Sequence, residues 1–255
     1  MPSDTDQNFG RILISNDDGI DAAGIKILYE IACKLSDDVW IVAPMDNKSG
    51  ASRSITLRKD VHIEERGPQM YACSGTPSDC IIFGMNRILD RKPDLVLSGI
   101  NAGMNVADDV LYSGTIAAAM EANLMDIPAI ALSQRNGGED EADFAVAARY
   151  GETVIRNLCQ MGWGPRMIMN INFPSVPVDS VKGITPATLD RHKIGDEIID
   201  GSAPNSYQLG PLVTNPVTLP GSDRNVMDEH WISLTALSMD IIAREAQSKL
   251  PTFEF

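Results

Sequence analysis

The sequence predicts an α/β fold, in which a mostly parallel sheet is covered by helices. Short apolar runs of strand length alternate with segments whose apolar residues recur every three or four positions. The apolar runs end in Pro, Gly, Asn or Asp, which close strands and open turns. Such alternation is typical of parallel strands joined by right-handed helical crossovers. A chain of 255 residues with 44% hydrophobic content is ample for one core.

Residues 1–176 carry this alternation and are expected to form that core. The expected strands, in order, are residues 11–15, 39–44, 71–74, 94–98, 129–133 and 167–174. They are nearly continuous apolar runs, such as VWIVAP and MIMNINFP, because strands of a parallel sheet are buried on both faces. The expected helices are residues 21–35, 76–89, 113–125 and 139–161.

Each expected helix has its own signal. The first has Asp21 as a natural N-cap, and its apolar residues, such as Ile25 and Leu28, follow helical spacing. The second has Pro77 in its first turn, where the missing N–H costs nothing. The third is rich in alanine, and the fourth has one apolar face that includes Gly151, a residue that lowers helix propensity.

Residues 177–255 are expected to form a C-terminal extension that joins subunits, not an independent domain. Pro, Gly and Asp punctuate short segments there, and helical periodicity is weak. Two extended pieces, residues 206–209 and 231–237, are expected to pair as a projecting hairpin that contacts another subunit. A plain surface excursion is the alternative.

Composition narrows the class of protein. A formal charge of −14 gives no electrostatic reason to bind nucleic acid polymers or anionic membranes. No apolar run approaches the ~20 residues that span a bilayer, and MPSDTDQNFG lacks the features of a signal peptide, so a cytoplasmic location is expected. The four cysteines are scattered without the spacing of a zinc site or a disulfide framework.

The turn SNDDG (15–19) places two carboxylates, Asp17 and Asp18, directly after the first expected strand. In open α/β sheets, ligands bind outside the carboxyl ends of the strands. Paired carboxylates there suit a hard cation such as magnesium or manganese. An ordinary turn is the structural alternative, because Asn, Asp and Gly all favour turns.

Two further loops follow parallel strands and are expected to converge on the same edge of the sheet. The loop NKSGASRS (47–54) offers Ser49 and Gly50 beside basic residues, a mixture suited to phosphate and equally consistent with a solvated loop. The loop that starts SGINAGMN carries Asn101 and Asn105, whose amide oxygens are neutral hard ligands.

The second of these loops ends in YSGT, immediately before the alanine-rich helix. Ser113, Gly114 and Thr115 would therefore present hydroxyls and free backbone N–H groups to an anion at the helix N-terminus. Ordinary N-capping by Ser113 or Thr115 is the structural alternative.

Together these segments resemble the SurE family of survival-protein nucleotidases. Five motifs occur in the family's order: SNDDG (15–19), the stretch from AP to NKSGASRSIT (43–56), SGTPSDC (74–80), SGINAGMN (98–105) and YSGTIAAAMEA (112–122). A weaker echo, SDRNVMDEHWISLTAL, lies at 222–237. The chain departs from the family at Asp21, Ala23, Ala122 and Ala236, and residues 195–220 match no motif.

The resemblance implies a Rossmann-like three-layer core with a C-terminal extension exchanged between subunits, in a homodimer or homotetramer. It implies a phosphatase that hydrolyses nucleoside 5'- and 3'-monophosphates, with polyphosphate as a further substrate of some members. It also implies one divalent metal ion per subunit, Mg2+ or Mn2+. By position the metal ligands are Asp17, Asp18, Ser49 and Asn101. Asp17 and Asp18 are then also the candidate catalytic residues, and the candidate phosphate contacts are Gly50, Asn105, Ser113, Gly114 and Thr115.

Two other functions would use similar residues. A regulator that binds nucleotides without hydrolysing them is the main alternative, although a simple anion binder gains nothing from two carboxylates aimed at its ligand. A metal-dependent nucleotide-sugar transferase would need a second large binding domain, for which this chain is too short. A route through an aspartyl phosphate is the lesser mechanism, because no DxDx pattern is present.

Overall fold

The main sheet spans nearly the whole length of the chain. The computed structural model describes residues 8–137, 143–242, 247, 249 and 251. Within them, nine strands form one sheet in the order β3-β4-β2-β1-β5-β6-β7-β11-β8. Their bounds, in that order, are Ile63–Gly67, Met70–Cys73, Val39–Pro44, Ile12–Ser15, Leu95–Ala102, Ala129–Gln134, Met167–Phe173, Trp231–Ser238 and Gly183–Pro186.

The interior of this sheet is parallel. Every neighbouring pair from β4 to β7 is parallel, whereas β3 runs antiparallel to β4 and β11 runs antiparallel to β7. The central strands β1, β5 and β6 are buried along nearly their whole length. The predicted α/β class is therefore confirmed. Strands β8 and β11 extend the core sheet from beyond residue 176, and the division of the chain into core and extension stays a prediction.

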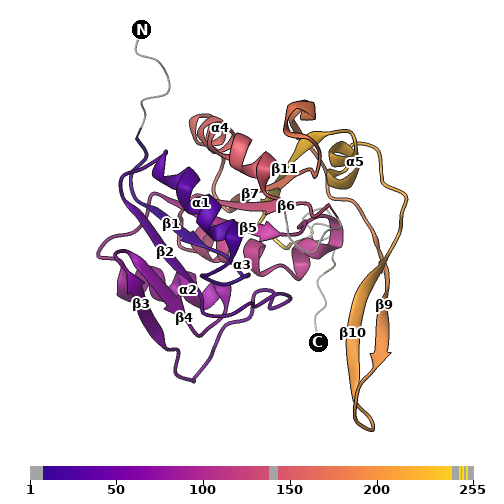
Figure 1. Ribbon diagram of the computed structural model, residues 1–255, viewed down its shortest axis with the longest axis horizontal. Helices are drawn as coiled ribbons and strands as arrows, with labels where there is room; N and C mark the ends of the chain where they lie inside the picture. Colours follow the sequence, from indigo (N-terminus) through magenta and orange to yellow (C-terminus); the bar gives the residue numbers. More distant parts are fainter. Residues whose placement is uncertain (1–7, 138–142, 243–246, 248, 250, 252–255) are drawn as a thin grey trace.

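Helices cover both faces of the sheet (Figure 1). On one face, α1 (Ala23–Cys33) and α4 (Ala145–Met161) pack over a cluster that includes Leu28 and Ile155. On the other face, α2 (Pro77–Phe83) and α3 (Gly114–Leu124) pack over a cluster that includes Ile81 and Ile116. Gly151 lets α1 and α4 approach closely, because a Cβ atom there would lie 2.8 Å from the Ile31 Cδ1.

Several helix boundaries differ from expectation. Helix α1 begins at Ala23, with Ala22 at the N-cap, so the predicted N-cap Asp21 is wrong. The preceding turn is fixed instead by the Ile20 N–H, which donates to the Pro44 carbonyl at 2.8 Å. Helix α2 ends at Phe83 and continues as a π-helical turn, Gly84–Ile88. Helix α4 begins at Ala145, and the start expected at residue 139 lies outside the described residues.

A two-stranded hairpin projects from the body of the molecule (Figure 1, orange). It pairs β9 (Lys193–Asp200) antiparallel with β10 (Tyr207–Thr214). The expected projecting hairpin exists, but its predicted partner is wrong, because residues 231–237 lie in β11 of the main sheet. Buried and more exposed residues alternate along the second half of β11, as expected for a strand with one face against the core.

Short helical segments complete the described fold. A 3-10 helix, Ala107–Leu111, lies between β5 and α3, and α5 (Asp223–Asp228) precedes β11. A further 3-10 turn, Val178–Ser180, follows β7. None of the described helices has the length and hydropathy to cross a bilayer.

Candidate functional site

Three loops converge at the carboxyl ends of the parallel strands, as the sequence predicts. The Lys48 N–H donates to the Asp17 carbonyl at 2.7 Å, which ties the loop after β2 to the loop after β1. The Ser52 N–H donates to the Tyr112 carbonyl at 3.1 Å, which ties the loop after β2 to the segment before α3. Backbone hydrogen bonds therefore join the three loops, and the Ser52 hydroxyl adds a side-chain contact by donating to the Leu111 carbonyl at 2.8 Å.

A pocket of about 500 Å³ opens where these loops meet. Its walls include six of the predicted site residues: Asp17, Ser49, Gly50, Asn101, Asn105 and Ser113. The rest of the lining consists of Asp109, Tyr112, Lys193, Asp196, Leu209, Gly210 and Leu212. Asp18, Gly114 and Thr115 lie beside this pocket, outside its lining.

The carboxylate of Asp17 is held by the first turn of α3. Its Oδ1 accepts a hydrogen bond from the Thr115 hydroxyl, and the backbone N–H groups of Gly114 and Thr115 also donate to the carboxylate. Asp17 is only 4% exposed, and this burial raises the pKa of its carboxyl despite the hydrogen bonds. A nearby cation would offset that cost of burial.

Asp18 is held differently. Its Oδ2 accepts from the Ala102 N–H at 3.0 Å, at the end of β5. Burial is again the main cause that raises the pKa of its carboxyl, and the neighbouring Asp17 charge adds to the shift. Two adjacent carboxylates are thus oriented by backbone N–H groups from two different elements.

The neutral members of the predicted metal set supply oxygen. The Asn101 Nδ2 donates to the Gly103 carbonyl at 2.9 Å, which orients the amide and leaves Oδ1 for another partner. Asn101 is the penultimate residue of β5, which extends beyond the expected strand end at residue 98. Ser49 follows a turn in which its N–H donates to the Asn47 Oδ1 at 2.7 Å. Carboxylate, amide and hydroxyl oxygens are the donors that hard divalent cations prefer, so this set fits magnesium or manganese.

The predicted metal set contains only two carboxylates. Over the described ranges, no group of three or more His, Cys, Asp and Glu side chains is placed to hold a metal ion. The candidate site therefore depends on the neutral oxygens of Ser49 and Asn101 beside Asp17 and Asp18.

The predicted phosphate contacts divide into two groups. Ser113 caps α3, since its hydroxyl oxygen accepts from the Ile116 N–H at 3.1 Å, and it also lines the pocket with Gly50 and Asn105. Gly114 and Thr115 instead donate hydrogen bonds to the Asp17 carboxylate. Their direct contact with phosphate stays a prediction.

The projecting hairpin supplies one wall of the pocket, which sequence reasoning missed. Lys193 crosses the Tyr112 ring with its Nζ 4.9 Å from the ring centroid, and it contacts the Tyr112 hydroxyl at 3.2 Å. The same Nζ pairs with Asp196 at 2.9 Å. Leu209 and Leu212 add apolar surface from the opposite strand. No local motif announces these residues, because they lie about eighty or more positions from the loops they face.

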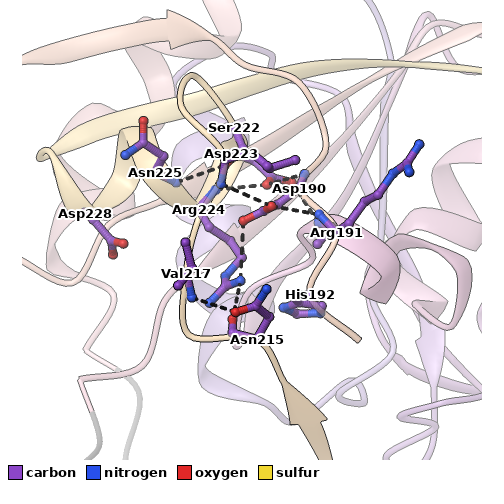
Figure 2. A network of polar contacts seen from close by, with 12 residues as sticks. Asp190, Arg191, His192, Asn215, Val217, Ser222, Asp223, Arg224, Asn225 and Asp228 are labelled. Atoms are coloured by element: carbon purple, nitrogen blue, oxygen red, sulfur yellow. Dashed lines mark hydrogen bonds and ion pairs between the residues drawn. The ribbon is translucent and has the colours of Figure 1, made fainter. Parts of the chain in front are cut away.

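A polar network joins the base of the hairpin to the start of α5 (Figure 2). The Asp223 carboxylate, which is fully buried, accepts from the backbone N–H groups of Ala107 and Asp190 at 2.8 and 3.1 Å. The Arg224 guanidinium donates to the Asn215 carbonyl at 3.0 Å and lies 3.4 Å from Asp190. These contacts join both ends of the hairpin to the 3-10 helix, so the position of the hairpin wall depends on them.

Comparison with known proteins agrees with this architecture. The 5'-nucleotidase SurE of Paramagnetospirillum magneticum is 42% identical over 256 residues, covering 99% of this chain and 98% of that protein. The 5'-nucleotidase SurE of Rhodospirillum rubrum is 41% identical, covering 98% of this chain and 96% of that protein. The crystal structure of the SurE protein from Aquifex aeolicus superposes with a TM-score of 0.83 at 29% identity, covering 94% of this chain and 98% of that one.

The family model described as survival protein SurE matches residues 12–196. That span runs from β1 into the hairpin and holds every predicted site residue. The match therefore includes the loops that carry the predicted site, and it ends before β11 and before the pocket residues Leu209, Gly210 and Leu212. With this match, two near-full-length relatives and the shared fold, the chain belongs to the SurE family.

Proposed function

We propose that this protein is a divalent-metal-dependent phosphatase that hydrolyses nucleoside 5'- and 3'-monophosphates to nucleoside and phosphate. The observation that carries the proposal is the mixed lining of one pocket. Its walls combine the polar side chains of Asp17, Ser49 and Asn101 with Tyr112 and the hairpin leucines Leu209 and Leu212. A ligand that joins a phosphate to a base matches this combination. The curated relatives carry the name 5'-nucleotidase, which supports the same substrate class.

The residues that would hold one Mg2+ or Mn2+ ion per subunit are Asp17, Asp18, Ser49 and Asn101. A divalent cation bound there supplies charge neutralisation for the phosphate and acidifies water. The protein's own contribution is to orient these oxygens before substrate arrives, through the bonds from Thr115 to Asp17 and from Ala102 to Asp18.

The remaining groups would position the phosphate and the nucleoside. Gly50, Asn105 and Ser113 face the same pocket and can donate N–H or O–H groups to phosphate oxygens. The free Oδ1 of Asp18 is suited to accept the proton of an attacking water, since its Oδ2 is already bonded to Ala102. Tyr112 and Lys193 form an aromatic and cationic wall on which a base can stack.

Nucleotide binding without hydrolysis is the competing function, and the adjacent carboxylates of buried Asp17 and half-buried Asp18 argue against it. The test is phosphate release from nucleoside 5'- and 3'-monophosphates, polyphosphate and an aryl phosphate, with magnesium, manganese or a chelator. We expect metal-dependent release that Asp17→Asn abolishes. Asp21→Asn is the matched control, because Asp21 is an exposed carboxylate of the same turn.

Calorimetric titrations with a nucleoside monophosphate and with Mn2+ complete the test. If the wild-type protein binds nucleotide but releases no phosphate with either metal, the regulator is the better description. If Asp17→Asn binds Mn2+ as tightly as wild type, the proposed ligand set is wrong.

We also propose that the protein is a homodimer or homotetramer, located in the cytoplasm, whose hairpin contacts another subunit. An isolated two-stranded hairpin is marginally stable in water. Its large apolar side chains are exposed, and contiguous exposed apolar surface usually marks an interface. These side chains are Ile194, Ile198, Ile199, Tyr207, Leu209 and Val213.

A further inference from the structure

A row of polar side chains crosses the centre of the sheet, where apolar residues are expected. Ser133 of β6 lies in register with Asn101 of β5 on one side and with Asn172 of β7 on the other. Ser233 of β11 continues the row beyond Asn172. Ser133, Asn172 and Ser233 are all fully buried. Burial of polar side chains in a core costs stability unless they find partners, so the row needs a physical reason.

The partner of this row is the loop residue Asn105. The Asn172 Oδ1 accepts from the Asn105 N–H at 2.8 Å, and the Asn172 Nδ2 donates to the Asn105 carbonyl at 3.0 Å. The Asn170 Nδ2 donates to the same carbonyl at 2.9 Å. One side chain of β7 thus pairs with both backbone groups of Asn105, as a neighbouring strand would, and a second reinforces the pairing.

Ser133 acts on the side chain of the same residue. The Asn105 Nδ2 donates to the Ser133 Oγ at 2.8 Å. This bond uses one of the two amide hydrogens and leaves the other, together with Oδ1, for the pocket that Asn105 lines. Backbone and side chain of Asn105 are therefore fixed by separate strands.

We propose that Ser133 and Asn172 are positioning residues of the phosphate site, which hold Asn105 in the geometry that contacts the phosphate of the substrate. The inference rests on the proposed function, because it assumes that Asn105 binds phosphate. It accounts for polar side chains at fully buried strand positions. Asn170 and Ser233 are less completely hydrogen-bonded than Ser133 and Asn172. In the described part of the chain, the Asn170 Oδ1 and the Ser233 Oγ have no hydrogen-bond partner.

The experiment compares Ser133→Ala and Asn172→Ala with the matched control Ser233→Ala. Ser233 is buried in the same row, but its hydroxyl contacts neither Asn105 nor the pocket. For the two positioning variants, we expect about a tenfold rise in the KM for a nucleoside monophosphate and in the Ki of inorganic phosphate, with a smaller change in kcat. A mere loss of folded enzyme lowers kcat without moving either constant.

The double variant Ser133→Ala with Asn105→Ala tests whether Ser133 acts through Asn105. We expect Ser133→Ala to have no further effect on the Ki of phosphate once the Asn105 side chain is gone. Equal effects in both backgrounds would overturn the proposal, and so would a wild-type Ki in Ser133→Ala alone. These two arms decide the question even if Asn172→Ala does not fold.

Hydrogen–deuterium exchange provides a readout that does not need turnover. Asn172→Ala should remove protection from the Asn105 amide, whereas Ser233→Ala should leave it intact. Retained protection in Asn172→Ala would overturn the role of Asn172. If wild type releases no phosphate while exchange follows this pattern, the proposed function fails but the loop anchor stands.

Discussion

Replacement of Gly114 with alanine tests how closely helix α3 must approach Asp17. A Cβ atom on residue 114 would lie 2.7 Å from the Asp17 Cβ, 2.9 Å from the Asp17 Oδ2 and 3.0 Å from the Pro77 Cγ. Ordinary contacts begin at 3.4 Å, so the carboxylate or the helix must shift by about 0.7 Å. Displacement of a catalytic group by about 1 Å can lower the rate by about 100-fold. We therefore expect kcat/KM to fall by about 10- to 100-fold.

Stability should change less than activity. Alanine favours a helix over glycine by about 1 kcal/mol, which offsets part of the strain in α3. The assay is metal-dependent phosphate release from a nucleoside monophosphate, with a thermal melt of the same preparation. Gly67→Ala is the matched control, because a Cβ atom at residue 67 meets nothing within 4 Å. If Gly114→Ala keeps the wild-type kcat/KM, the close approach of α3 to Asp17 does not matter to the reaction.

Three further predictions concern a buried ion pair, the pocket wall and the hairpin. Arg11→Met should lower the free energy of unfolding by about 2 kcal/mol at pH 7, because the buried Arg11 guanidinium donates to the Asp38 carboxylate at 2.8 Å. Burial opposes ionisation of Asp38, but hydrogen bonds from Arg11 and Trp40 outweigh it and lower its pKa. The stabilisation is therefore present above the unfolded pKa of about 3.9 and is lost as the pH falls through the lower folded pKa. Urea titrations measure the difference in free energy of unfolding between wild type and Arg11→Met. The same difference at pH 7 and well below pH 3.9 would contradict this reasoning. Tyr112→Leu should raise the KM for a nucleoside monophosphate by about tenfold, because base stacking is lost. The KM for glycerol phosphate, which has no base, should not change. Equal increases for both substrates would show that Tyr112 does not bind the base. Ile198→Asp should reduce the molar mass measured by light scattering to that of a monomer, and an unchanged mass would exclude this part of the hairpin from the interface.

Local sequence was sufficient for the core of the fold. The parallel strands are mostly apolar runs, because both of their faces are buried, and Ser133 of β6 and Asn172 of β7 are among the polar exceptions. The paired aspartates and the two asparagine-containing loops follow those runs directly, so the topology of a parallel sheet brings them to one edge. The helix N-terminus at Ser113 was also readable, since hydroxyl capping depends on residues within one turn.

Helix boundaries and strand pairing followed less directly from local signals. Helix α1 begins at Ala23 because the turn before it is tied to β2, which no local signal records. The extended piece at 206–209 pairs with β9, and the piece at 231–237 joins the main sheet, because burial along β11 matches the core better than a solvated hairpin. Pairing partners are chosen by tertiary burial, not by extended character alone.

The sequence by itself determined the six strands of the parallel core and the edge where the loops after them meet, because these depend on periodicity and on residues adjacent to strand ends. Only the tertiary structure decided that Lys193 and Tyr112 share a wall, and that Asn172 pairs with Asn105. Those contacts join residues about 65 or more positions apart, through loop closure and packing that leave no periodic trace in the chain.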